Sequence, residues 1–437
     1  MVNNELKKAE ILKIAKENDV KFIRLQFIDI FGFVKSVCIT LGQLERVLKN
    51  GCMFDGSSIQ GFARVEESDM RLVPDLDTFC ILPFSNEAGN MARLICDVYT
   101  TEQKPFEGDP RYILKKALNH AKELGYSVDI GPECEFFLFD KNENGQIQLT
   151  GNDSCGYFDV APVDKGSLAR RQICIALEKM GFTVEASHHE SAPCQQEIDF
   201  KYSNALDAAD KIITCKMAIK AIAAERNLHA TFMPKPVYGI AGSGMHVNIS
   251  LSNEKGNAMS GEEVANLSKD ATYFIAGILK HAKGFCAITN PLVNSYKRLV
   301  SGYEAPTSIT WALRNRSPLI RVPYFDAKHA RIELRNPDCS CNPYLAFAAI
   351  IEAGLEGIIN KLPVPAMLST SAYELKDIDA LPQDLYSAIE ELKKDECILN
   401  ALGPIISQVY IDFKEKEWAE YKTVVSSWEI ENYLNKY

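Results

Sequence analysis

Residues 131–139 read GPECEFFLF, residues 244–251 read GMHVNISL, and residues 330–336 read ARIELRN. Polar and apolar residues alternate in each stretch, which is typical of a β-strand with one buried face. Glu133 and Glu135 are two positions apart, so on a strand both side chains point to the same face. The alternating polar residues of the other two stretches are His246, Asn248, Ser250, Arg331, Glu333 and Arg335. One such strand is ordinary, but three with ligand-type side chains favour a polar cavity lined by strands.

A fourth segment, VEASHHESAPCQQEIDF (184–200), adds further carboxylates. Glu190 and Glu197 would point to opposite faces of an unbroken strand, and Pro193 between them predicts a bend that turns both inward. So many carboxylates require cations to neutralise them, and an oxygen-rich set with one imidazole suits Mg²⁺ or Mn²⁺ rather than structural zinc. The predicted donor set is Glu133, Glu135, Glu190, Glu197, His246 and Glu333.

Arginines are concentrated near these acidic strands. Six of the fifteen arginines fall between residues 298 and 335. The planar guanidinium fork binds phosphate and carboxylate oxygens. Cations beside a carboxylate–metal set are typical of phosphoryl transfer, where catalysis is mostly positioning and charge neutralisation. Surface ion pairing is the alternative explanation for the same arginines.

The chain of 437 residues divides by pattern into a small and a large unit. Strand-like runs dominate the first hundred residues, including one predicted at 77–83, and the segment 101–110 has the composition of a linker. Beyond it, predicted helices alternate with strands, among them helices at 343–360 and 405–433. The fold class is therefore α+β, with domains expected at 1–103 and 104–437.

Composition excludes several classes of function. The net charge of −10 disfavours a nucleic-acid binder and attraction to an anionic membrane. The start of the chain lacks an apolar signal core, and no apolar run approaches the length of a membrane span. Thirteen scattered cysteines without a C-x-x-C pair indicate a reducing, cytoplasmic environment.

Eight ordered motifs resemble class I glutamine synthetase, in its short branch that is not adenylylated, over almost the whole chain. They include FDGSS (54–58), HHESAP (188–193), NSYKRLVSGYEAP (294–306) and NPYLA (342–346). The resemblance implies a β-grasp-like N-terminal domain and a catalytic domain built as an open antiparallel β-barrel with surrounding helices. It implies ligation of ammonium to the γ-carboxylate of L-glutamate through γ-glutamyl phosphate, with ATP as co-substrate.

The resemblance also assigns two metal positions. Glu135, Glu190 and Glu197 would hold one cation, and the second would be held by Glu133, His246 and Glu333. Two Mg²⁺ or Mn²⁺ ions per site are therefore expected.

Roles in substrate binding follow from the same resemblance. Glutamate would be bound by Arg298 and Arg335, with Gly242 and His246 nearby. Arg316 and Arg321 would meet the transferring phosphate. The remaining nucleotide contacts are expected from Glu185, Tyr202, Asn248, Ser250, Lys328 and Arg331.

Ammonium binding would depend on a neighbouring subunit of a dodecamer of two hexameric rings. Asp55 of that neighbour would take the proton from ammonium, with Ser58, Tyr157 and Glu190 close by. Glu304 lies in the loop expected to close over glutamate. Glu304, Asp55 and Arg316 are the residues expected to be catalytic.

Several positions depart from the family pattern. Ala241 stands where Asn is usual, and Ser301 replaces a proline of the loop. Asp379 occupies the position of the tyrosine that is adenylylated in another branch, so control by glutamine feedback is expected instead, with Arg64 as a candidate residue. A regulatory protein is a possible partner. The alternatives are a γ-glutamyl ligase for alkylamines or polyamines, and a catalytically silent regulatory ring.

Overall fold

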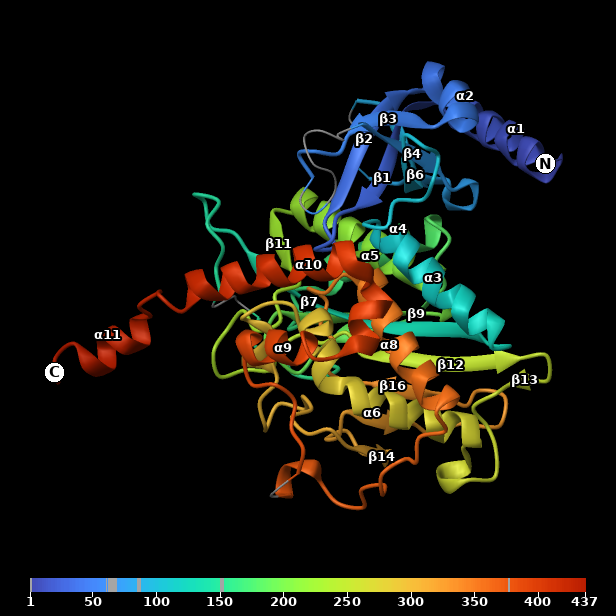
Figure 1. Cartoon of the computed structure of the whole chain (residues 1–437). Helices are drawn as coiled ribbons and strands as arrows, with labels where there is room; N and C mark the ends of the chain where they lie inside the picture. Colours follow the sequence, from blue (N-terminus) through green and yellow to red (C-terminus); the bar gives the residue numbers. More distant parts are fainter. Residues whose placement is uncertain (1, 60, 62–68, 85–87, 150–152, 376–377) are drawn as a thin grey trace.

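The computed structural model describes the chain except for residues 1, 60, 62–68, 85–87, 150–152 and 376–377. Two separate sheets, each with its own helices, organise the described residues (Figure 1). The expected α+β class is confirmed. No helix in the described parts of the chain has the length and apolar character needed to cross a membrane.

The N-terminal sheet has the strand order β2-β1-β6-β4-β3, with β5 added beside β6. β1 and β6 run parallel, whereas the other pairs are antiparallel. Alternate residues of β1, such as Ile23 and Leu25, are buried against Leu44 and Val47 of helix α2. The elements are α1 (Val2–Glu17), β1 (Val20–Ile28), β2 (Val34–Thr40), α2 (Leu41–Asn50), β3 (Cys52–Asp55), β4 (Asp69–Pro74), β5 (Cys80–Leu82) and β6 (Asn90–Thr100).

The second sheet curls into an open barrel and contains all four stretches of alternating polar residues. Its order is β14-β15-β16-β12-β7-β9-β8, antiparallel except for the parallel pair β14–β15. The expected open antiparallel barrel is thus confirmed. The strands are β7 (Ser127–Asp140), β8 (Val184–His189), β9 (Gln195–Phe200), β12 (Val247–Asn253), β14 (Trp311–Leu313), β15 (Ile320–Val322) and β16 (Ile332–Leu334), with short additions β10 (Ser203–Asn204), β11 (Leu228–Thr231) and β13 (Gly256–Asn257).

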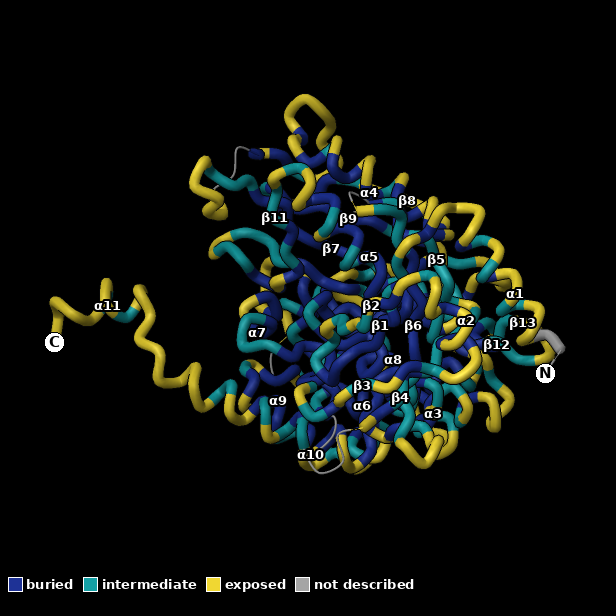
Figure 2. The backbone as a smooth tube through the Cα atoms, turned by 90° about the horizontal axis from the view of Figure 1, so that it is seen from above, coloured by how far each residue is buried: buried dark blue, intermediate teal, exposed yellow. Residues whose placement is uncertain are grey.

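Helices surround this sheet and close the main core, which Figure 2 shows as the dark-blue interior. Side-chain caps start several of them: Asn204, Ser268 and Asn342 each accept a hydrogen bond from a backbone N–H of the first turn. The helices are α3 (Pro110–Glu123), α4 (Ser167–Lys179), α5 (Ala205–Glu225), α6 (Lys269–Thr289), α7 (Ser295–Arg298), α8 (Pro343–Ile359), α9 (Leu385–Leu392), α10 (Glu396–Tyr421) and α11 (Ser427–Tyr433).

Two predicted elements were wrong in their bounds. The helix expected at 405–433 is two helices, because α10 already begins at Glu396 and ends before α11. Gly403, with φ of 76°, forms a kink in α10, and Pro404, which has no N–H to donate, follows at that kink. The strand expected at 77–83 begins instead with a 3-10 turn at Leu76–Thr78, which Asp75 caps.

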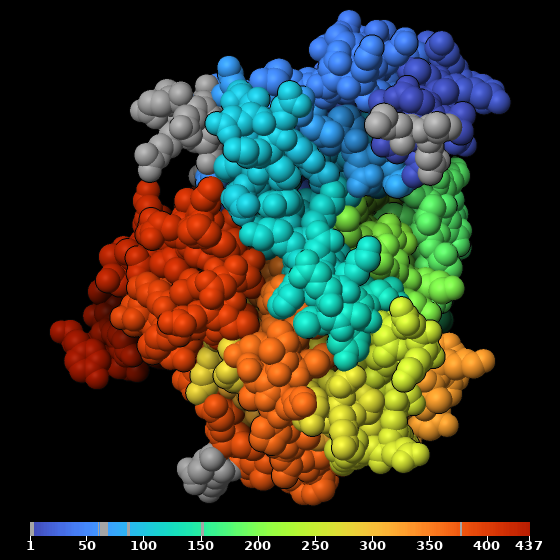
Figure 3. Space-filling model, turned by 45° about the vertical axis from the view of Figure 1, so that its right-hand side comes forward, coloured from blue at the N-terminus to red at the C-terminus, as the bar shows by residue number. Residues whose placement is uncertain are grey.

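Arg111 joins the two sheets. Its guanidinium is 2% exposed and pairs with Asp75 at 2.8 Å, Asp97 at 2.6 Å and Asp210 at 2.9 Å. Two of these carboxylates belong to the N-terminal sheet region and the third to α5, while Tyr344 donates to Asp210 at 2.7 Å. Figure 3 shows the blue N-terminal part packed against the cyan segment that follows it in the chain.

Candidate active site

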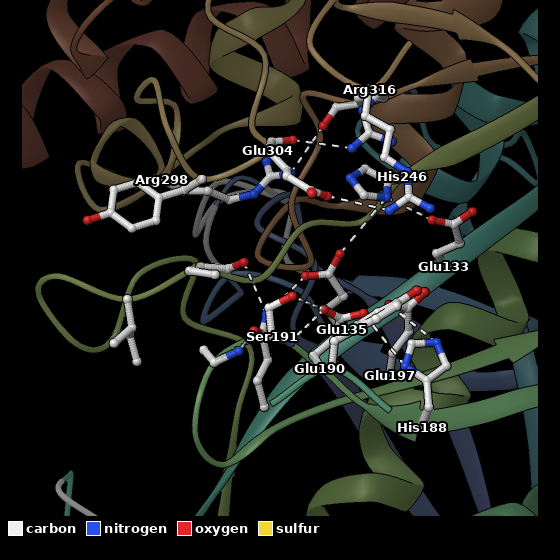
Figure 4. A pocket seen from close by; sticks show the side chains of 18 of the residues that line it. Glu133, Glu135, His188, Glu190, Ser191, Glu197, His246, Arg298, Glu304 and Arg316 are labelled. Atoms are coloured by element: carbon white, nitrogen blue, oxygen red, sulfur yellow. Dashed lines mark hydrogen bonds and ion pairs between the residues drawn. The ribbon is translucent and has the colours of Figure 1, made fainter. Parts of the chain in front are cut away.

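A cavity of about 720 Å³ opens along the polar face of the second sheet (Figure 4). All six predicted metal ligands line it, together with the predicted residues Tyr157, Gly242, Glu304 and four arginines. These arginines are Arg298, Arg316, Arg321 and Arg335. Side chains that are up to 200 positions apart in the sequence therefore share one cavity.

Strand register explains why the carboxylates meet. In the antiparallel pair β7–β9, Glu135 lies opposite Glu197 and Glu133 lies opposite Asp199. In the pair β8–β9, His188 lies opposite the same Glu197. Directly opposed residues have Cβ atoms about 5 Å apart, so the four carboxylates form an acidic row across β7 and β9, and His188 of β8 lies beside it.

The first group of donors is formed by Glu133, His246 and Glu333, whose ligand atoms lie within 4.8 Å of one another. His246 Nδ1 lies 2.7 Å from Glu133, and Asn248 donates to the other oxygen of that carboxylate at 3.0 Å. Burial raises the pKa of Glu133, but His246 and Asn248 outweigh it and bring the pKa to about 2. Glu133 is thus held in the ionised form, which is the form in which a carboxylate can bind a cation.

The second group lies on the other side of Glu135. Ligand atoms of His188, Glu190 and Glu197 also lie within 4.8 Å of one another. The bend expected at Pro193 is the turn of the β8–β9 hairpin, where Cys194 adopts a left-handed φ of 64° and Glu190 N donates to Gln195 O at 2.9 Å.

Glu135 lies between the two groups, 3.9 Å from His246 Nδ1. It accepts hydrogen bonds from Gly244 N at 2.9 Å and Gln195 Nε2 at 3.1 Å. Burial, and then Glu190, raise its pKa. Burial and the neighbouring Glu135 likewise raise the pKa of Glu197. Carboxylates that repel one another in this way are the groups that a divalent cation stabilises.

Arg298 is a buried cation at the wall of the cavity, and burial lowers its pKa. Its guanidinium donates to the three backbone carbonyls of residues 335–337 at 2.7–3.2 Å. Glycines make room for it, because a Cβ added at Gly244 would lie 2.3 Å from Nη2, and one at Gly242 3.2 Å from Cγ. Its position is fixed by backbone acceptors, which leaves its charge available to an anion in the cavity.

A second arginine group lies around Glu333, which is 1% exposed. Arg321 donates to one oxygen at 2.5 Å, and Arg335 contacts the other. Arg335 also donates to the backbone carbonyl of Glu304 at 3.2 Å, and the Glu304 side chain reaches Arg316 at 3.4 Å. The loop that carries Glu304 is thereby attached to the rim of the cavity, as Figure 4 shows.

Six residues predicted to contact the nucleotide are not among those that line the cavity. Asn248 pairs in register with Gly131, which packs against Tyr202, and Arg331 donates to Asn248 at 3.3 Å. Asn248 also contacts Glu133, which links this group to the first set of donors. Three of the six are exposed, namely Glu185, Tyr202 and Lys328, and the other three, Asn248, Ser250 and Arg331, are partly buried.

Asp55 and Ser58 are not brought to the cavity of the same chain. Both are exposed near the end of β3. Asp55 accepts hydrogen bonds from Ser57 N at 2.8 Å and Oγ at 2.6 Å, and these lower its pKa. Arg64 lies outside the described residues.

Several residues at the cavity were not predicted as site residues, among them Gln195, Asp199, Tyr303 and the nearby Lys235. Gln195 and Asp199 line the cavity on the same strand face as Glu197, so the alternation that identified Glu133 and Glu135 could have found them. No pattern in the sequence indicated that Lys235 lies near the cavity.

Lys235 connects two loops at the cavity. Its ammonium group contacts the backbone carbonyl of Ile240 and lies 3.9 Å from the ring centroid of Tyr303. Asn294 holds its backbone from both sides, at 2.7 Å and 3.0 Å. Ala241 follows Ile240 and packs on a small apolar cluster that includes Cys194.

The acidic row predicts how stability depends on pH without cations. Burial, and then Glu133, raise the folded-state pKa of Asp199 from 3.8 to about 7. Between these values the folded chain binds more protons than the unfolded chain, so stability falls as pH rises from about 4 to about 7. We expect the free energy of unfolding of the chelated protein to fall by on the order of 2–4 kcal/mol between about pH 4 and about pH 7. Added Mg²⁺ should remove most of the loss.

Thermal unfolding across this pH range, with EDTA and with Mg²⁺, measures the effect. A melting temperature of the chelated protein that stays constant or rises with pH would contradict it.

Comparison with known proteins agrees with this geometry. The family model described as "Glutamine synthetase, catalytic domain" matches residues 107–433, and that described as "Glutamine synthetase, beta-Grasp domain" matches residues 19–101. Glutamine synthetase of Clostridium saccharobutylicum is 54% identical, covering 98% of this chain and 99% of its own length. The Staphylococcus aureus (strain N315) enzyme is 52% identical, covering 98% of each chain.

Solved structures give the same result. A structure titled as a GmaS/ADP complex superimposes with a TM-score of 0.90 at 32% identity, covering 97% of this chain and 99% of its own. Glutamine synthetase of Plasmodium falciparum superimposes with a TM-score of 0.87 at 28% identity, covering 98% of each chain. The chain therefore belongs to the glutamine synthetase family, the enzymes that ligate ammonium to glutamate at the expense of ATP.

Proposed function

We propose that the cavity holds two divalent cations, Mg²⁺ or Mn²⁺, at the two groups of donors. Glu135, Glu190 and Glu197 would hold one, and Glu133, His246 and Glu333 the other. The donor chemistry supports hard cations, since it is dominated by carboxylate oxygen. Such cations supply Lewis-acid stabilisation of charge on phosphoryl oxygens. His188 is within reach of the first position and is a candidate additional ligand.

Glutamate and the transferring phosphoryl group would be bound by the arginines. Arg298 and Arg335 are suited to hold glutamate, with Gly242 and His246 at the same wall. Arg316 and Arg321 then face the phosphoryl group, where they offset the charge that develops during transfer. The γ-carboxylate attacks the γ-phosphorus of ATP, ADP leaves, and γ-glutamyl phosphate forms.

The adenine and ribose would lie beside the cavity. The cluster around Asn248 and Arg331 adjoins the first donor group, so a nucleotide bound there would direct its phosphates toward Glu133. Its contacts would come from Glu185, Tyr202, Asn248, Ser250, Lys328 and Arg331.

Ammonium would bind at Glu190 and Tyr157 on the cavity rim, and a second subunit would complete this position. Asp55 and Ser58 are exposed, which supports their insertion into a neighbour's cavity within a dodecamer of two hexameric rings. Asp55 would take a proton from ammonium, and the resulting ammonia attacks the acyl phosphate and releases phosphate. Glu304 would close the loop over glutamate and exclude water.

The domain division at residues 103–104 remains part of this proposal. β6 ends at Thr100 and α3 begins at Pro110, so the boundary falls in the connection between the two sheets. A cytoplasmic location is supported by thirteen cysteines that are all free thiols.

The observation that carries the proposal is that both donor groups and four arginines line one cavity. The test is phosphate release from ATP and Mg²⁺ with glutamate, comparing ammonium, methylamine and no acceptor. We expect turnover with ammonium and formation of glutamine. Release only with methylamine would indicate an alkylamine ligase instead. No release with any acceptor, from an assembled oligomer, would favour a silent ring.

A further inference from the structure

A second group of metal-type ligands lies where α6, α8 and the start of α10 meet. One ligand atom each from His281, Glu356 and Cys397 lies within 4.8 Å of the other two. None of these three residues lines the active-site cavity. His281 is buried, whereas Glu356 and Cys397 are partly exposed, so the group is reachable from solvent. The three helices pack against one another, and Figure 1 shows α6 in yellow, α8 in orange and α10 in red.

The orientation of His281 is set by a carboxylate. Both oxygens of Asp395 lie 2.8–2.9 Å from His281 Nδ1, while Nε2 faces Glu356. A metal-binding histidine typically donates one ring N–H to a carboxylate and binds the metal through the other nitrogen. His281 has this arrangement, with Nδ1 at Asp395 and Nε2 turned toward Glu356.

The position of Asp395 is built into the fold. Its side chain caps α10 by accepting from Ile398 N at 3.2 Å. It lies against Gly284, one turn after His281 on α6, where an added Cβ would be 2.1 Å from Asp395 Oδ2. Only a residue without a Cβ leaves space for this carboxylate beside the imidazole.

We propose that His281 Nε2, Cys397 Sγ and a Glu356 oxygen bind a zinc ion, with the fourth position open to solvent. A thiolate, an imidazole and a carboxylate are the donors that zinc prefers, in contrast to the oxygen-rich active site. The ion would hold α6, α8 and α10 together at the point where α10 begins.

Replacing two protons of the cluster by one Zn²⁺ ion leaves its net charge unchanged. Without a metal, an imidazole between two carboxylates carries both ring protons, and Cys397 carries its thiol proton, since burial and then Glu356 and Asp395 raise its pKa to about 12. Zn²⁺ displaces the Nε2 proton and the thiol proton, so the net charge of the cluster does not change. Lys280, 2.8 Å from Glu356, remains paired with that carboxylate.

Cobalt tests the proposal because it reports a sulfur ligand directly. The full-length protein is freed of metals with a chelator, saturated with Mg²⁺ to fill the active site, and titrated with Co²⁺. We expect a thiolate-to-cobalt charge-transfer band that saturates at one ion per chain and is displaced by Zn²⁺. The active-site donors contain no sulfur among the cavity-lining residues described, so cobalt bound there gives no such band.

Variants locate the band. Cys397→Ser should abolish it and leave ammonium-dependent turnover unchanged. Asp395→Asn, which retains an oxygen to cap α10, should weaken Co²⁺ binding about 10–100-fold. Cys38→Ser, at an exposed cysteine, is the matched control and should leave the band intact.

One other group deserves its own control, because Asp153, Cys155 and His189 also lie close together. A band that is lost in Cys155→Ser but kept in Cys397→Ser would overturn the proposal. Absence of any band in the folded wild-type protein would overturn it as well.

Discussion

Replacing Glu333 with glutamine is expected to lower kcat by about 10³-fold while the chain stays folded. The side chain is almost fully buried and contacts Arg321 and Arg335, and it lies within 4.8 Å of Glu133 and His246. Glutamine preserves the shape but removes the charge that both the cation and the two arginines require. The arginines would then repel each other across a neutral amide.

Steady-state phosphate release with ammonium measures this effect, and titration with Mg²⁺ tests whether the activation constant rises. Glu178→Gln, at an exposed position on α4, is the matched control and should be indistinguishable from wild type. A loss in Glu333→Gln of less than about 10-fold would show that this carboxylate is not a metal ligand during turnover.

Replacing Arg298 with lysine is expected to raise the KM for glutamate by about 10–100-fold, which corresponds to one lost charge-assisted hydrogen bond of 1.5–3 kcal/mol. A guanidinium can donate to the carbonyls of residues 335–337 and still present N–H groups to the cavity. An ammonium group has three donors and no fork, so it cannot do both.

The discriminating measurement is the KM for glutamate against the KM for ATP in the same variant. The KM for glutamate should change far more than the KM for ATP, because six of the predicted nucleotide contacts are not in the cavity lining that contains Arg298. Lys297→Arg is the matched control: it makes the reverse substitution at the adjacent, exposed position and should leave both constants unchanged. Equal changes in both constants would contradict the assignment of Arg298 to glutamate.

The sequence predicted the parts of the site that depend on strand periodicity. Alternation alone placed Glu133 beside Glu135 and put Glu333 on a polar face, because a strand leaves only two directions for a side chain. The approach of His188 to Glu197 depends on hairpin register, and that register depends on a turn with a left-handed cysteine that no local pattern predicts.

Long-range contacts could not be predicted either, because no local sequence pattern indicates which distant residues will meet. Lys235 acts across two loops that are separate in the chain, and its neighbours give no hint of either contact. The start of α10 was missed because Gly403 and Pro404 look like a helix boundary, whereas the fold absorbs them as a kink after Asp395 has already capped the helix.

The Arg111 junction also limits how this chain can recombine with its relatives. A chimaera that took only its first hundred residues from another sequence would exchange Asp75 and Asp97 but keep Arg111 and Asp210. A mismatch at Asp75 or Asp97 would leave the buried guanidinium with Asp210 but without one of its other acceptors, at a cost on the order of 1–3 kcal/mol. Although the two parts have separate cores, a stable chimaera therefore requires that both sides of the Arg111 ion-pair network come from compatible sequences.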